Sequence, residues 1–218
     1  MRASLRLILG LTLVVVTLAR ADDGRPAFVR VSPRDDRYFE TADGAPYIPI
    51  GPNLVSPPYV RSNDPQARLE ALDRWLGKLQ ANGGNYIRVW ISNDFYEVEH
   101  ERAGQYDPER AQRIDAMLAS ARKHGIRVKM TIEHFREVDP AHPRQSWAVK
   151  ALHHTSRGGL VNTMEEWIAS PEARTQFVGK LDFLAGRYRD EPTVYGWELW
   201  NEMNAVLGKG DYLGWTAA

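Results

Sequence analysis

The sequence contains no cysteine, no excess charge of either sign and only one long uncharged run. Without cysteine the chain forms no disulfides, so its stability must come from a hydrophobic core. Lysine and arginine total 28 and aspartate and glutamate total 28, so the sequence is not basic enough to suggest a nucleic-acid partner. No second hydrophobic run follows the first, which leaves no candidate for an internal membrane span.

The single uncharged run has the features of a secretory signal peptide. Arg2 and Arg6 precede the uncharged residues 7–18, and Ala19-Arg20-Ala21 follows as a small-x-small cleavage site. A membrane span needs about 20 apolar residues, so the run is too short to be an anchor, and no cysteine follows it for lipid attachment. We therefore predict cleavage after Ala21 and a secreted or periplasmic protein, residues 22–218, with 25 basic and 28 acidic residues.

Aromatic residues are abundant, with seven tryptophans and nine tyrosines. Such side chains fill cores, and their flat faces also match the apolar faces of sugar rings. Composition by itself favours the core interpretation.

A β-hairpin is predicted near the start of the mature chain. Two apolar stretches within residues 37–50 flank Asp43-Gly44, which is a strong hairpin-turn signal. The second stretch continues through the sequence YIPIGPNL, where a first parallel strand is expected to end at Asn53.

After the hairpin, strands and helices alternate. Asp-Pro or Ser-Pro pairs, typical of helix starts, precede helical periodicities that begin near residues 65, 108 and 171, and Gly83-Gly84 and Gly125 end the first two. Runs rich in β-branched and aromatic residues cover 85–92, 126–135 and 193–202. This order predicts right-handed βαβ units around a parallel sheet, and therefore an α/β fold.

Polar residues close each predicted strand. In α/β folds, ligand sites lie at the carboxyl ends of the parallel strands. The residues at these ends are Asn53, Arg88, Trp90, His134, Asn201 and Glu202. This common position is the first indication of function.

Arg88 is expected to face the inner side of the sheet, because alternation places Ile87, Val89 and Ile91 on the other face. A guanidinium in that position requires a carboxylate partner. Either Glu198 serves as a structural partner, or a catalytic carboxylate is held in its ionised form. The sequence leaves both open.

Glu202 is a candidate general acid/base. Trp200, two residues earlier, would disfavour the ionised carboxylate and raise its pKa. Asn201 could hydrogen-bond a substrate hydroxyl, but both neighbours reach one pocket only if the strand end bends or bulges. The alternative is a solvated pair of residues at the start of the next helix.

His134 closes the third strand run, and we expect it to form hydrogen bonds. The spacing of His134, His142, His153 and His154 matches no compact ligand motif, so no metal site is expected. The long connection over 135–165 is either a binding loop or disordered.

The stretches GPNL, GGNYIRVWIS, HGIRVKMTIEHF and WELWNEMN resemble, in this order, the first four strand signatures of the clan A glycoside hydrolases. The resemblance is closest to glycoside hydrolase family 5, the cellulase and mannanase family. It implies a (β/α)8 TIM-barrel type of fold and retaining hydrolysis of β-linked polysaccharide without a cofactor. It also implies Glu202 as acid/base, Asn201 on the sugar 2-hydroxyl, and His134, Arg88, Trp90 and, more weakly, Asn53 as substrate-binding residues.

A retaining mechanism needs a second carboxyl group about 5–5.5 Å from the first. In the family this is a glutamate ending strand seven, whereas only strands one to four are recognisable here. Glu198 lies four residues before Glu202, about 13 Å away along a strand, and is too distant. Glu133 is conceivable, but alternation points it away from His134.

Two hypotheses follow. In the first, residues 22–218 are the N-terminal half of a secreted glycoside hydrolase barrel, inactive without the remainder. In the second, the chain is a non-catalytic half-barrel that binds glycans or associates with another half.

Overall fold

The computed structural model describes residues 27–61, 64–134, 137–141, 150–206 and 211–217. The predicted signal peptide, residues 1–21, lies outside this described part, as does His142. Within the described part, no helix is both long and apolar enough to cross a membrane.

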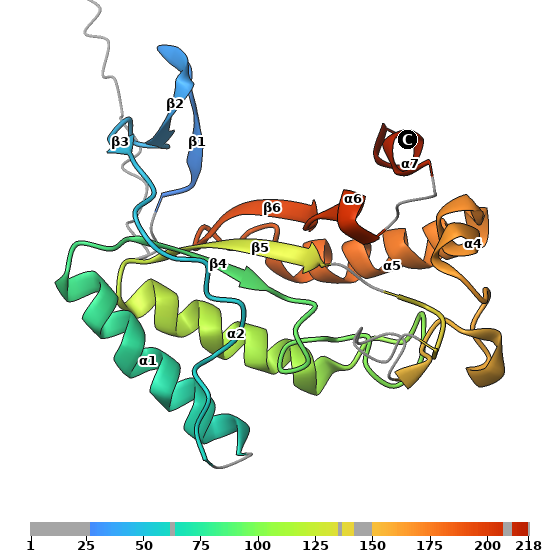
Figure 1. Ribbon diagram of the computed structural model, residues 1–218. Helices are drawn as coiled ribbons and strands as arrows, with labels where there is room; N and C mark the ends of the chain where they lie inside the picture. The colour runs from blue at the N-terminus through green and yellow to red at the C-terminus, as the bar shows by residue number, and fades with distance from the viewer. Residues whose placement is uncertain (1–26, 62–63, 135–136, 142–149, 207–210, 218) are drawn as a thin grey trace, which may run out of the picture.

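The chain begins with an antiparallel sheet of three short strands, β1 (Val29–Ser32), β2 (Asp35–Thr41) and β3 (Pro46–Tyr47). The predicted turn joins β2 to β3, and Gly44 has φ +90°, a left-handed conformation that glycine adopts at little cost. Strand β1 was not predicted from the sequence. The sheet stands at the end of the molecule where the parallel strands start (Figure 1).

A parallel sheet of β4 (Tyr86–Trp90), β5 (Arg127–Glu133) and β6 (Val194–Trp200) forms the centre, in that order. The helices of this region and of the C-terminal residues are α1 (Pro65–Ala81), α2 (Pro108–Lys123), α4 (Met164–Ala169), α5 (Pro171–Tyr188), α6 (Met203–Val206) and α7 (Tyr212–Ala217), with a 3-10 turn η1 (Thr155–Arg157). The strand–helix alternation predicted from the sequence is therefore present.

Helices α1 and α2 lie along one face of the sheet (Figure 1). Their apolar sides meet alternate strand residues in one buried core, which includes Leu72, Leu76, Ile114, Met117, Ile87, Val89, Val128 and Met130. Each of α1, α2 and α5 starts at a predicted cap: Asp64, Asp107 and Ser170 accept hydrogen bonds from backbone N–H groups of the first turn.

The expected first parallel strand is largely absent as regular structure. Only Pro46–Tyr47 is a strand, and the following segment pairs with β4 through an isolated bridge between Asn53 and Arg88. Arg88 N donates to Pro52 O at 3.1 Å and Leu54 N to Arg88 O at 2.7 Å. Pro49 and Pro52 have no N–H to donate, which explains why the ladder is interrupted.

Candidate active site

The carboxyl ends of β4, β5 and β6 point to the same side of the sheet, away from the hairpin (Figure 1). The bridge at Asn53 adds the neighbouring segment on the other side of β4. The residues predicted from the strand ends are therefore gathered at one edge of the fold.

Arg88 forms a two-pronged ion pair with Glu198 across the sheet. Its Nε lies 2.8 Å from Oε2 of Glu198, and its Nη2 lies 2.6 Å from Oε1. Lys129 Nζ is 2.9 Å from the same carboxylate. Burial would raise the pKa of Glu198, but hydrogen bonds from Arg88 and Lys129 outweigh it and lower the pKa to about 2. Of the two partners left open for Arg88, the structure shows Glu198.

The same guanidinium orients two amides. Arg88 Nη2 donates to Oδ1 of Asn201 at 2.6 Å, and Nη1 donates to Oδ1 of Asn53 at 3.2 Å. Because the Asn201 oxygen accepts from Arg88, its NH2 group is the part that can donate to another acceptor.

Glu202 follows β6 in a left-handed conformation, with φ +52°, and is exposed. Such a backbone is uncommon for a residue other than glycine and is often found at functional sites. The chain therefore bends at Glu202, and the sequence analysis required a bend here if Asn201 and Glu202 were to reach one pocket. The charge of Glu202 contributes to raising the pKa of Arg88, after the larger effect of the Glu198 hydrogen bond.

Trp90 and His134 form a stacked pair beside this network. Their rings are 4.7 Å apart and inclined by 19°, and the Arg88 guanidinium carbon lies 5.9 Å from the Trp90 ring centre. Nδ1 of His134 is 2.6 Å from the hydroxyl oxygen of Ser92. Sequence reasoning missed Ser92, although it shares the inward-facing register of Arg88 and Trp90.

Trp200 belongs to an aromatic cluster with Trp167, Phe177 and Trp215, at ring distances of 5.5 to 5.9 Å. These partners come from α4, α5 and α7, so the cluster joins the end of β6 to three helices. Trp197, in contrast, is 39% exposed. The aromatic residues of this strand thus divide between the core and the surface.

Glu133 points away from the strand-end site. Its side chain is completely buried and pairs with Lys180 of α5. The alternation argument predicted this direction, and the structure agrees with it.

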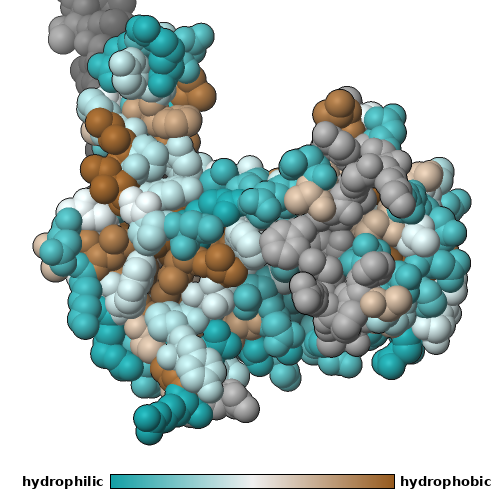
Figure 2. Space-filling view, in the orientation of Figure 1, coloured by the Kyte–Doolittle hydropathy of each residue, from teal (hydrophilic) through white to brown (hydrophobic). Residues whose placement is uncertain are grey.

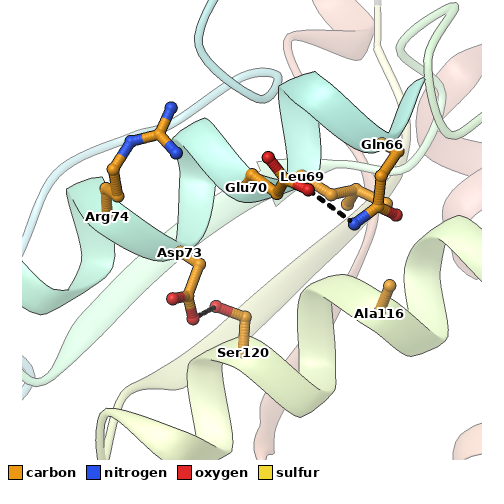
Figure 3. Close-up of a pocket in the computed structure, with 7 residues that line it drawn as sticks. All are labelled: Gln66, Leu69, Glu70, Asp73, Arg74, Ala116 and Ser120. Atoms are coloured by element: carbon orange, nitrogen blue, oxygen red, sulfur yellow. Dashed lines mark hydrogen bonds between the residues drawn. The ribbon is translucent and has the colours of Figure 1, made fainter. Parts of the chain in front are cut away.

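A separate pocket lies between α1 and α2 (Figure 3), lined by Gln66, Leu69, Glu70, Asp73, Arg74, Ala116 and Ser120. Its polar groups bond to one another: Gln66 donates to Glu70 at 3.2 Å and Ser120 to Asp73 at 2.7 Å. Hydrogen bonds from Lys123 and Ser120 lower the pKa of Asp73 to about 2. The bond between Gln66 and Glu70 lies within α1, whereas the bonds from Ser120 and Lys123 to Asp73 join α2 to α1. We assign the pocket no chemistry.

Metal ligands do not gather anywhere in the described residues, where no group of three or more His, Asp or Glu side chains could hold an ion.

The fold and the polar residues at the carboxyl ends of its strands define a class of protein: α/β proteins with a polar site at the ends of parallel strands. Comparison with known proteins narrows this class. No family model matches the chain. Mannan endo-1,4-beta-mannosidase 3 of Oryza sativa subsp. japonica is 25% identical over 151 residues, 65% of this chain and 31% of that protein. Mannan endo-1,4-beta-mannosidase 1 of Solanum lycopersicum is 24% identical over 214 residues, 94% of this chain and 50% of that protein.

A glycoside hydrolase family 5 structure from Bacteroides vulgatus aligns with TM-score 0.51 and 19% identity, over 87% of this chain and 35% of that one. The chain is therefore related to the clan A glycoside hydrolases and, among them, to family 5, as the strand signatures predicted. It spans about a third to a half of the length of these curated relatives.

Proposed function

We propose that this chain forms half of a (β/α)8 glycoside hydrolase barrel, residues 22–218, and carries the acid/base of a retaining β-glycosidase. The proposal rests chiefly on the convergence of Asn53 and Asn201 on one guanidinium next to Glu202, at the carboxyl ends of parallel strands. Ligand sites of α/β folds occur at such ends.

In this proposal Glu202 protonates the oxygen of the leaving sugar and then deprotonates the attacking water. The NH2 group of Asn201, oriented by Arg88, donates to the 2-hydroxyl, where hydrogen bonds strengthen in the transition state. Trp90 and His134 form a wall of the sugar site, and Trp90 presents a flat apolar surface to a sugar ring. No cofactor takes part.

The nucleophile is proposed to come from outside these residues. Glu198 is held by Arg88 and Lys129, which keep it ionised and oriented toward them. Glu133 is buried against Lys180. Both in-chain candidates thus have other partners, and we expect the 218-residue chain alone to be inactive.

Among β-linked polysaccharides, β-1,4-mannan is the first substrate to test, because the matched relatives are mannan endo-1,4-beta-mannosidases. Cellulose and other β-glucans are the comparison substrates. We also propose that the leader directs the protein to secretion or the periplasm, with no membrane attachment after cleavage.

The test is reducing-sugar release from β-mannan and β-glucan, by the 218-residue chain and by the product of the reading frame sequenced beyond the Ala218 codon. We expect no release by the former. We expect release by the latter to fall about 10²–10⁴-fold in Glu202→Gln, the range typical of general acid–base catalysis. Asp190→Asn is the matched control, because Asp190 is 89% exposed and precedes β6 at the opposite end of the strand.

Hydrolysis by the 218-residue chain that Glu202→Gln abolishes would contradict the proposed inactivity. Hydrolysis by the longer product that is insensitive to Glu202→Gln would contradict the acid/base assignment.

The second candidate function is a non-catalytic half-barrel that binds glycans or associates. It is favoured by the exposure of Trp197 and Leu199 on β6, at 39% and 47%. Saturable quenching of tryptophan fluorescence by mannohexaose, without hydrolysis, would support this alternative.

A further inference from the structure

A cluster of buried charges lies behind the strand-end site. Lys180 of α5 is fully buried, and its Nζ lies 2.8 Å from Oε1 of Glu97 and also contacts Oε1 of Glu133. Lys180 shares the apolar side of α5 with Phe177 and Leu184. A buried ammonium is costly unless carboxylates surround it, so these contacts indicate a specific requirement for the charge.

The two carboxylates belong to segments that hold His134. Glu133 is the last residue of β5, directly before His134, and its carbonyl oxygen accepts the N–H of Asn201 at 2.9 Å. Glu97 lies in the loop after β4, and the same loop contains Ser92, whose hydroxyl contacts the His134 ring. The Lys180 ammonium therefore connects α5 to the two segments that contact His134, which are the end of β5 at Glu133 and the loop that contains Glu97 and Ser92. The first of these segments also accepts the backbone N–H of Asn201.

The cluster contains more negative than positive groups. Glu99, 3% exposed, lies next to this pair: its N–H donates to Glu97 Oε1 at 3.1 Å, and His153 Nε2 is 3.7 Å from its Oε2. Burial, together with the charges of Glu97 and Glu133, raises the pKa of Glu99 to about 7, although Lys180 opposes this shift. Without Lys180, carboxylates packed this closely would lose the cation that neutralises them, and they would separate or take up a proton.

We propose that Lys180 is a positioning residue of the candidate active site: it holds the end of β5 and the loop after β4 in the register that presents His134 and Asn201. The catalytic meaning of this inference rests on the proposed function. Lys180 touches no reacting atom, and acts through Glu133 and Glu97. The proposal thus adds Lys180, on the helix behind the sheet, to the residues that shape the candidate site.

The test compares Lys180→Met with Lys123→Met in the full chain. Lys123 pairs with Asp73 at 2.8 Å but is 63% exposed and lies on α2. Nuclear magnetic resonance of 15N-labelled protein reports the ring nitrogens of His134 and the side-chain amide of Asn201, assigned with His134→Gln and Asn201→Asp. We expect both signals to shift by more than a line width in Lys180→Met and to stay in place in Lys123→Met.

Signals that remain unshifted in a folded Lys180→Met protein would overturn the proposal, because a purely stabilising lysine would lower the melting temperature without moving them. If Lys180→Met does not fold, the same signals are measured in Glu133→Gln. Glutamine keeps the shape of the side chain and an acceptor oxygen, but it removes the negative charge that pairs with Lys180. Shifted signals in Glu133→Gln support the proposal, and unshifted signals or loss of folding reject it. Hydrolysis is not used here, so an inactive chain leaves this result independent of the proposed function.

Discussion

Two carboxyl groups of this protein, the half-buried Glu198 and the buried Glu99, have pKa values displaced in opposite directions. Glu198 faces Arg88 and Lys129, and its pKa falls to about 2. Glu99 is buried near other carboxylates, and its pKa rises to about 7. The same side-chain type thus stabilises the folded state at neutral pH in one place and destabilises it in the other.

Glu99→Gln is expected to stabilise the protein only above acidic pH. Below about pH 4.5, Glu99 is protonated in both the folded and unfolded states and the substitution has little effect. As pH rises from 4.5 to 7 the unfolded chain ionises first, so the wild-type protein loses stability that the glutamine variant keeps. The gain should reach roughly 3 kcal/mol well above pH 7, measured by urea unfolding across this range.

Glu101→Gln is the control, because Glu101 lies two residues away with its side chain 81% exposed. It should give no pH-dependent gain of this size. A gain in Glu99→Gln that is equal at pH 4 and pH 8 would contradict the raised pKa.

At the scale of elements, the backbone of the segment before α1 packs very closely against the backbone of β4. A Cβ atom on Gly51 would lie 1.7 Å from the carbonyl oxygen of Tyr86. Asn85 N donates to Ile50 O at 2.9 Å next to this contact. The pairing that carries Asn53 to Arg88 therefore depends on glycine at position 51.

Gly51→Ala is expected to destabilise the protein by about 1–3 kcal/mol, because the backbone of either segment must move. The contact from Arg88 to Asn53 should weaken with it. The matched control is Gly186→Ala in α5, where nothing lies within 4 Å of the added carbon. That substitution should stabilise by roughly 0.5–1 kcal/mol, since alanine favours helix. Urea unfolding measures both, and equal stabilities of the two variants would refute the argument.

The secondary structure was largely predictable because its signals are local. Caps such as Asp64 and Ser170 and the helical periodicities depend on residues a few positions apart. The first parallel strand was predicted too long because Pro49 and Pro52 break the ladder. Ser92 and Lys180 were missed because their partners lie 42 and 47 positions away, at His134 and Glu133.

At the scale of the whole molecule, two of the exposed apolar groups lie on or beside the parallel sheet. Ile48 and Ile50, 67% and 56% exposed, lie where the hairpin joins the parallel sheet, and Figure 2 shows hydrophobic atoms on this side. Trp197 and Leu199 are exposed on β6, which pairs with β5 alone in the described part of the chain. Exposed apolar strands at a sheet edge favour association.

The isolated chain is therefore expected to self-associate at micromolar concentration, and the double variant Trp197→Lys/Leu199→Lys to sediment as a smaller species. Lysine on an edge strand opposes pairing with another chain. Val178→Lys, at a position of α5 that is 45% exposed, is the control and should leave the association unchanged. Sedimentation velocity measures all three proteins, and a monomeric wild-type chain would contradict the association hypothesis.

The sequence by itself determined the three long helices α1, α2 and α5, the three regular parallel strands and the candidate residues at the strand ends, because capping, periodicity and alternation act between near neighbours. Only the tertiary structure decided that Arg88 pairs with Glu198 while orienting Asn53 and Asn201, and that Lys180 pairs with Glu97 and Glu133. Those contacts join residues up to 113 positions apart. Their geometry depends on how the strands pair and on which side of the sheet each helix packs.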